Sequence, residues 1–121
     1  MTHKAELKAD YLQNWHRLRT MGVYQIKNQV NGRVFLGASL NLDGTITRDR
    51  QWLPRGGHQN HQLQRDWKAF GAEAFTFEIL ETLTPTDDPR DYAGEVALLL
   101  EAWKAQLEPY GDKGYLSPPR R

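Results

Sequence analysis

Two short hydrophobic runs with a turn signal between them lie in the first half of the chain. Val23–Ile26 and Val34–Leu36 are rich in β-branched and aromatic residues, a composition typical of strands. Asn31 and Gly32 lie between the runs, and both tolerate the positive φ angles that tight hairpin turns require. The pattern therefore predicts a β-hairpin over residues 22–38.

Three other stretches carry hydrophobic residues at the spacing of a helix. They predict amphipathic helices over residues 4–18, 59–70 and 90–107. Their expected buried stripes are, in chain order, Leu7, Tyr11, Trp15 and Leu18; Leu63, Trp67 and Phe70; and Val96, Leu100, Trp103 and Leu107.

The remaining segments divide into one strand and several loops. Residues 75–79 alternate between hydrophobic and polar side chains, which predicts a half-buried strand. Residues 40–57 contain Gly44, Pro54 and further turn residues, so we expect a long loop there, and an irregular tail at 117–121. This order predicts an α+β fold, a small three-stranded antiparallel sheet flanked by helices with an added N-terminal helix. We expect a single domain over residues 1–121, with its core at 22–116.

Composition narrows the class of protein. The 121 residues include no cysteine, which excludes a disulfide scaffold and zinc sites built on thiolates. The longest aliphatic run is Leu98–Leu100, so we expect no membrane span, and the polar start does not resemble a signal peptide. A cytoplasmic location is the default expectation.

The net charge of +1 conceals an uneven distribution. Residues 1–68 hold 11 basic and 5 acidic side chains, a net of +6, and residues 69–121 hold 5 basic and 10 acidic, a net of −5. Such asymmetry can mark a binding surface for an anionic partner, although ordinary solvated surface gives the same pattern.

The hairpin carries a pair of similar tripeptides. Gly22-Val23-Tyr24 begins its first strand and Phe35-Leu36-Gly37 lies on its second. Gly57-His58 leads into the helix predicted at 59–70, and Gly114-Tyr115 lies near the end of the chain. In this order and spacing the chain resembles the GIY-YIG nuclease superfamily over residues 22–116. The resemblance implies hydrolysis of phosphodiester bonds in DNA or RNA with a single divalent metal, Mg²⁺ or Mn²⁺.

The resemblance also assigns roles to particular residues. It implies that Tyr24 helps to activate the attacking water, that His58 contacts phosphate or relays a proton, and that Glu101 holds the metal. An arginine after the hairpin would steady the phosphate, and we prefer Arg50 to Arg48. Structural alternatives remain open: a packed strand tyrosine, a backbone-bonded histidine, a solvent-facing helix carboxylate and surface arginines. Further expected nucleic-acid contacts are Arg48, Arg55, Arg65 and Lys27, and Gly22, Phe35 and Gly37 complete the structural motif.

Three positions depart from the pattern of the superfamily. Phe35 lies where a second tyrosine is usual, and Leu116 replaces the asparagine that follows Gly-Tyr. Glu101 is two residues before Trp103, whereas the family's glutamate is three before its aromatic residue, at the place of Leu100 here. One position rotates a helical side chain by about 100°. The sequence therefore suggests a metal-dependent endonuclease, with a catalytically degenerate nucleic-acid-binding module or a protein-interaction domain as alternatives.

Overall fold

The computed structural model describes residues 20–84 and 92–118. The expected helix over residues 4–18 lies outside the described residues. The elements, in chain order, are strands β1 (Met21–Asn28) and β2 (Val34–Ser39), helices α2 (Leu42–Arg55) and α3 (His61–Phe70), the 3₁₀ turn η1 (Ala72–Ala74), strand β3 (Phe75–Leu83), helix α4 (Tyr92–Leu107) and the 3₁₀ turn η2 (Gly111–Lys113).

The three strands form one antiparallel sheet in the order β2-β1-β3, as expected for an α+β fold. The predicted hairpin is present, because β1 and β2 pair directly from Gly22↔Ser39 to Lys27↔Val34. Its turn contains Gly32 at a φ of 78°, a left-handed conformation that favours glycine. The strand predicted at residues 75–79 is also present and runs further, to Leu83.

Helix α2 occupies most of the segment expected to be a loop, so that prediction is wrong. Its two ends are well capped: the Asn41 side chain accepts a hydrogen bond from the Gly44 N–H, and Gly56 ends the helix in the left-handed conformation. Pro54 lies in the last turn of the helix. The stripe Leu42, Ile46, Asp49 and Leu53 faces the core and stabilises a segment whose own helix propensity is low.

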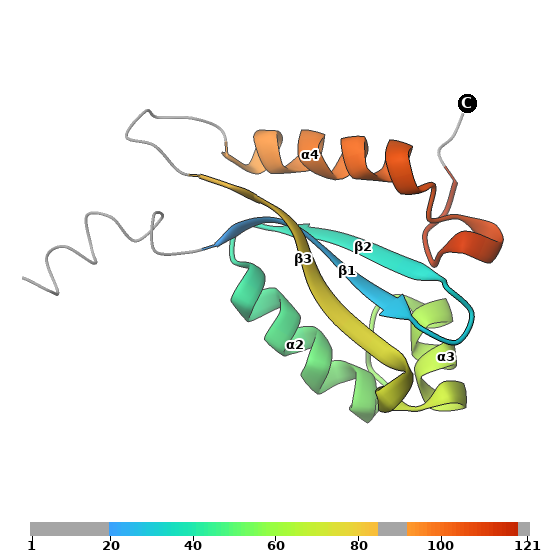
Figure 1. The fold of residues 1–121 in the computed structure, drawn as a ribbon. Coiled ribbons are helices and arrows are strands. Elements are labelled where there is room, and N and C mark those ends of the chain that lie inside the picture. Colours follow the sequence, from blue (N-terminus) through green and yellow to red (C-terminus); the bar gives the residue numbers. More distant parts are fainter. Residues whose placement is uncertain (1–19, 85–91, 119–121) are drawn as a thin grey trace, which may run out of the picture.

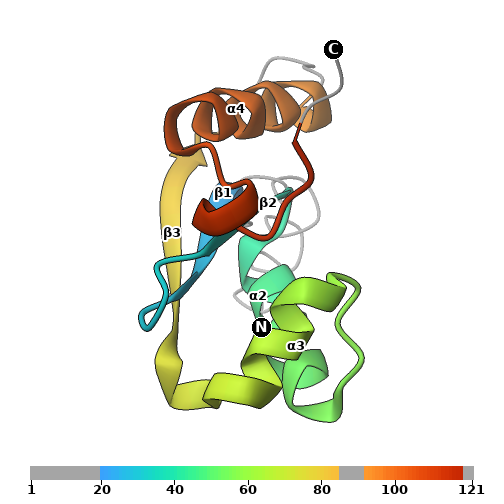
Figure 2. The same cartoon turned by 90° about the vertical axis from the view of Figure 1, so that its right-hand side faces the viewer.

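The sheet separates two layers of helix. In Figure 1, α2 and α3 lie below the sheet and α4 lies above it, and Figure 2 shows the same layers after a quarter turn. Successive residues of a strand point to opposite faces, so Tyr24 and Ile26 of β1 face the lower layer, where they join the main core with Leu42, Leu53 and Leu63. The intervening residues of β1 face α4.

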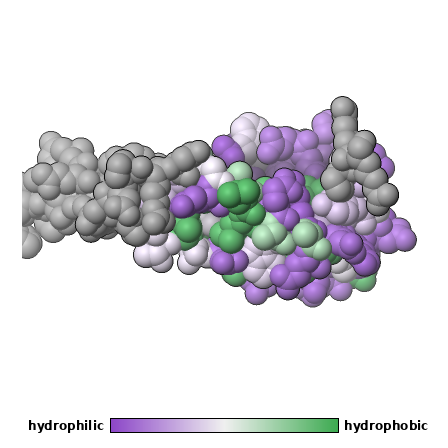
Figure 3. Space-filling model, turned by 90° about the horizontal axis from the view of Figure 1, so that it is seen from above, coloured by the Kyte–Doolittle hydropathy of each residue, from purple (hydrophilic) through white to green (hydrophobic). Residues whose placement is uncertain are grey.

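Helices α3 and α4 confirm the helices predicted at 59–70 and 90–107. On α4, Val96 is buried, whereas Leu98 is 73% exposed. Figure 3 views the molecule from the side of α4 and shows hydrophobic residues bordered by hydrophilic ones. None of the helices within residues 20–84 and 92–118 has the length and apolar character needed to cross a membrane.

Candidate active site

A buried polar cluster joins Tyr24 of β1, Asp49 of α2 and His58 of the loop after α2. The Tyr24 hydroxyl donates a hydrogen bond to Asp49 Oδ2. The other carboxylate oxygen, Oδ1, lies 3.2 Å from His58 Nε2. The three residues are only 3%, 5% and 6% exposed, so each contact operates in surroundings of low polarity where charge interactions are strong.

Polar contacts on both sides fix the loop that carries His58. The Gln64 side chain bridges this loop and α2: its Oε1 accepts from the His58 backbone N–H at 2.9 Å, and its Nε2 donates to the Leu53 carbonyl at 2.8 Å. Gln64 is itself buried. The position of the imidazole is therefore set by α3 and by the end of α2.

The tautomer of His58 follows from its neighbours. The Asn60 backbone N–H donates to Nδ1 at 3.0 Å, so Nδ1 acts as an acceptor and carries no proton. A neutral ring then has its proton on Nε2, the nitrogen next to Asp49 Oδ1. The contact between Nε2 and Oδ1 does not have the geometry of a hydrogen bond, and Nε2 has no other hydrogen-bond partner among the described residues. His58 therefore directs a weakly satisfied N–H toward the carboxylate.

Tyr24 keeps its proton in this environment. Burial raises the pKa of the Tyr24 hydroxyl well above its usual range, and the hydrogen bond to Asp49 raises that pKa further. A protonated hydroxyl can donate to Asp49 but cannot itself accept a proton from water. Tyr24 is therefore suited to hold the carboxylate in place.

Phe35, which stands where a second tyrosine was expected, packs inside the cluster. Its ring meets His58 edge to face at 5.5 Å between centroids and lies 6.2 Å from the ring of Tyr24. A hydroxyl is absent there, but the ring still supports both polar side chains. Gly37 leaves room for Tyr24, because a Cβ at this position would lie 2.5 Å from Tyr24 Cε1.

Asp49 and His58 reach the surface in a pocket of about 240 Å³. The pocket is also lined by Arg48, Trp52, Gly57 and Gln59. Arg48, which was expected less strongly than Arg50, is therefore the arginine that lies beside the cluster. The preferred Arg50 is not brought there: its guanidinium lies 4.3 Å above the Phe77 ring and lines a separate hollow.

The other expected nucleic-acid contacts are spread over the surface. Arg55 is exposed at the end of α2, and Arg65 is exposed on α3. Lys27 alternates with Ile26 on β1 and so belongs to the face covered by α4. These three residues do not line the pocket beside Asp49.

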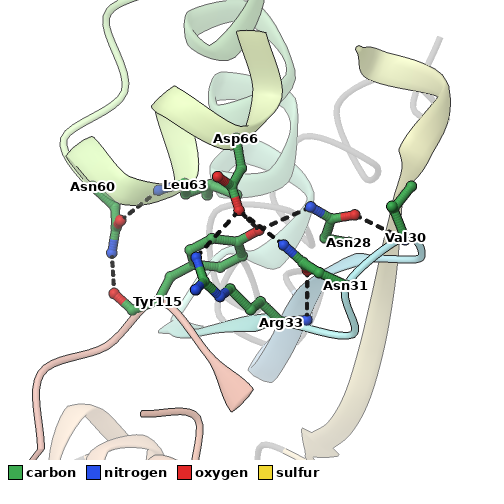
Figure 4. Close-up of polar contacts among 8 residues, drawn as sticks. All are labelled: Asn28, Val30, Asn31, Arg33, Asn60, Leu63, Asp66 and Tyr115. Carbon is green, nitrogen blue, oxygen red and sulfur yellow. Dashed lines mark hydrogen bonds and ion pairs between the residues drawn. The ribbon is translucent and has the colours of Figure 1, made fainter. Parts of the chain in front are cut away.

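The Gly114-Tyr115 motif attaches the end of the described chain to the hairpin and α3 (Figure 4). The Tyr115 hydroxyl donates to Asp66 Oδ2 at 2.7 Å and accepts from Asn28 Nδ2 at 3.2 Å. Asn60 Nδ2 donates to the Tyr115 carbonyl at 2.9 Å. Burial, and then the hydrogen bond to Asp66, raise the pKa of Tyr115 to about 12. Tyr115 therefore has a structural role, and Leu116 packs against the core beside it.

Comparisons with known proteins show which fold this chain shares. No family model matches the chain. Intron-associated endonuclease 1 of Enterobacteria phage T4 is 34% identical over 62 residues, which are 51% of this chain but only 25% of that protein. The solved catalytic domain of homing endonuclease I-TevI is 26% identical, with a TM-score of 0.64 over 78% of this chain and 95% of that domain. A point mutant of the catalytic domain of intron endonuclease I-TevI is also 26% identical, with a TM-score of 0.66 over 80% of this chain and 92% of that domain. The chain has the GIY-YIG fold. The likeness to a homing-endonuclease catalytic domain supports a nuclease function.

Within this GIY-YIG fold, Glu101 does not join the cluster. Its side chain is 68% exposed, and its Oε1 lies 3.7 Å from Lys104 Nζ. It lies on α4, on the opposite side of the sheet from Asp49 (Figure 1). The neighbouring Trp103 donates from its indole nitrogen to Glu81 Oε1 at 2.8 Å and so fixes the rotation of the helix. Another carboxylate of α4, Glu95, is in the first turn of the same helix. The structure thus departs from the expectation that Glu101 supplies the carboxylate of the site that contains Tyr24.

Asp49 is the carboxylate that sequence reasoning missed. A signal was present, because Asp49 is the one polar residue in the helical stripe Leu42, Ile46, Asp49 and Leu53. The residues at 20–84 and 92–118 contain no group of three or more His, Asp or Glu side chains arranged around a metal. Mg²⁺ needs no such group, since it is commonly held by one or two carboxylates together with water and substrate phosphates. Asp49 fits this role, because Tyr24 and His58 orient its oxygens as outer partners orient a metal ligand.

Proposed function

We propose that this chain is a GIY-YIG-type endonuclease that hydrolyses phosphodiester bonds in nucleic acid at the pocket lined by Arg48, Asp49 and His58. The observation that carries the proposal is the placement of the Asp49 carboxylate between Tyr24 and His58, at the wall of that pocket. The likeness to a homing-endonuclease catalytic domain supports the reaction type.

Each residue has a chemical task in this proposal. Arg48 binds a phosphate oxygen, because the N–H donors of its planar guanidinium match the geometry of a phosphate group. Asp49 accepts the proton of the attacking water while the water oxygen bonds to phosphorus, and the leaving oxygen keeps the electron pair of the broken P–O bond and takes a proton from solvent. Tyr24 and His58 hold Asp49 in place. Mg²⁺ or Mn²⁺, when bound at Asp49, supplies charge stabilisation at the phosphate and lowers the pKa of bound water.

Cleavage of end-labelled single-stranded and double-stranded DNA and RNA tests the proposal, with Mg²⁺, Mn²⁺ or EDTA present. Asp49→Asn keeps the shape of the side chain and removes its charge, so we expect loss of cleavage with binding retained. Glu101→Gln is the matched control, since Glu101 is exposed on the other side of the sheet, and we expect its cleavage rate to equal that of the wild type. Full activity of Asp49→Asn, or its loss in Glu101→Gln alone, would overturn the assignment.

A second candidate is a nucleic-acid-binding module that has lost cleavage. It is favoured by the exposed position of Glu101 and by the absence of a hydroxyl at Phe35 and of an amide at Leu116. The same assay separates the two functions. Binding that weakens with added salt, without cleavage in either metal, would support the module.

A further inference from the structure

Trp52 is an exposed aromatic residue at the edge of the proposed active site. It is 47% exposed on α2, and its side chain lines the pocket together with those of Arg48 and Asp49. Residues three and four positions apart lie on the same face of a helix, so the indole, the guanidinium and the carboxylate project side by side. An exposed indole at a polar pocket offers a flat apolar face on which an aromatic ring of a ligand can stack.

The loop after α2 holds the indole beside the pocket. The Gly57 N–H donates to the Trp52 carbonyl at 3.0 Å, and Gly57 itself lies against the ring. A Cβ at Gly57 would lie 2.6 Å from Trp52 Cε3 and 3.1 Å from Cζ3. The ring can therefore occupy this position only because residue 57 has no side chain. A ring held in place loses less freedom on binding than a mobile one.

We propose that Trp52 is a stacking platform for an unpaired nucleobase next to the phosphate that Arg48 binds, so that the substrate is single-stranded or locally unpaired nucleic acid. This inference rests on the proposed function and specifies its substrate. In a duplex, both faces of a base are covered by its neighbours, so a base must leave the stack before it can contact Trp52. The cavity of about 240 Å³ is below the roughly 300–1,000 Å³ of pockets for drug-sized ligands, a size suited to one ring system.

Binding without cleavage tests the proposal, because stacking and catalysis then separate. Three fluorescein-labelled ligands of equal length are titrated in EDTA: a single-stranded oligonucleotide, its duplex, and an abasic strand that keeps the sugar-phosphate backbone but has no bases. The wild type should bind the single strand more tightly than the abasic strand or the duplex. Trp52→Ala should weaken single-strand binding by roughly 5- to 150-fold, the range for loss of one base–aromatic stack. Binding of the abasic strand should not change.

Three further variants act as controls. Trp52→Phe keeps an aromatic ring and should retain most of the affinity. Gly57→Ala should weaken single-strand binding without removing the ring, because the added methyl group displaces the indole. Trp103→Phe, on the other side of the sheet, should leave all three affinities unchanged.

The failure of the inference differs from the failure of the proposed function. If the abasic strand binds the wild type as tightly as the single strand does, or if Trp52→Ala binds the single strand normally, stacking is wrong while nucleic-acid binding stands. If no ligand binds at low salt, the proposed function falls and the stacking platform falls with it.

Discussion

The hydroxyl of Tyr24 on β1 is hydrogen-bonded to the carboxylate of Asp49 on α2, across 25 residues of sequence. The bond joins a motif residue of the hairpin to a helix that contains no recognisable motif. It identifies Asp49, and not Glu101, as the carboxylate that the tyrosine contacts.

Replacing Tyr24 by phenylalanine should impair both stability and cleavage. The change leaves Asp49 without its buried donor, and the loss of a hydrogen bond to a charged group costs about 1.5–3 kcal/mol. Urea unfolding measures the loss of stability, and the assay with labelled strands measures the loss of cleavage. Tyr115→Phe is the matched control, since it also removes a hydroxyl that donates to a carboxylate. It should be destabilised to a similar extent but, once folded, should cleave normally. Equal cleavage by both variants would contradict the positioning role of Tyr24.

Alkaline pH should weaken the fold through Tyr115. A tyrosine in the unfolded chain ionises near pH 10, whereas Tyr115 keeps its proton up to about pH 12 in the folded chain. The stability gained from the protonated hydroxyl is therefore complete below about pH 10 and is lost as the pH rises toward about 12. The difference in unfolding free energy between the wild type and Tyr115→Phe, measured by urea titration at about pH 9 and about pH 11.5, should shrink. A difference that stays constant would show that the hydroxyl is not held protonated.

Gly37→Ala should disturb the active site from the neighbouring strand. A Cβ at residue 37 would lie 2.5 Å from Tyr24 Cε1 and 2.9 Å from the Tyr24 hydroxyl oxygen, so the phenol ring must move. We expect a loss of about 1–3 kcal/mol of stability, the usual cost of overpacking, together with a fall in cleavage. A crystal structure of the variant would show whether Tyr24 has left Asp49. Ala38→Gly, one residue along β2 and so on its other face, is the comparison.

Asp66→Ala should loosen the end of the described chain. Asp66 Oδ2 accepts hydrogen bonds from the Tyr115 hydroxyl at 2.7 Å and from Asn31 Nδ2 at 3.2 Å. Without it, hydrogen exchange of the backbone amides in residues 110–118 should speed up, while exchange in α4 stays unchanged. Equal protection of residues 110–118 in the variant and the wild type would show that the backbone contacts of this segment hold it without Asp66.

Removal of the Glu101 carboxylate should have little effect. Glu101 and Lys104 form an exposed pair three residues apart on α4, and such pairs are worth at most about 1 kcal/mol. Glu101→Ala should therefore unfold within about 0.5 kcal/mol of the wild type, as is usual for surface substitutions. Calorimetry of Mn²⁺ binding should give the same affinity for both proteins. A large loss of Mn²⁺ affinity in Glu101→Ala would show that the metal binds on α4.

The sequence predicted the elements whose own pattern is strong. The hairpin follows from its two hydrophobic runs and the Asn31-Gly32 turn, and α3 follows from Leu63 and Trp67 at helical spacing. Helix α2 was missed because Gly44 and Pro54 argue for a loop, whereas caps at both ends and burial against the sheet make the helix stable.

The candidate site could be predicted only in part for the same reason. Tyr24 and His58 have motif neighbours, and sequence reasoning found them. Asp49 could not be identified before α2 was known to be a helix, because only the helix places this carboxylate on the buried stripe with Leu42 and Leu53. The choice between Arg48 and Arg50 also depends on that helix, since two residues differ by about 200° around its axis.

The central strand β1 lies between two layers of helix, one formed by α2 and α3 and the other by α4. Neighbouring residues of this strand point to opposite faces: Tyr24 and Ile26 join the core cluster with α2 and α3, whereas Val23 is buried outside that cluster. Changes in unfolding free energy from substitutions at distant sites without shared partners usually add. It follows that α4 can accept new surface chemistry, including a new binding face, without repacking the residues around Asp49.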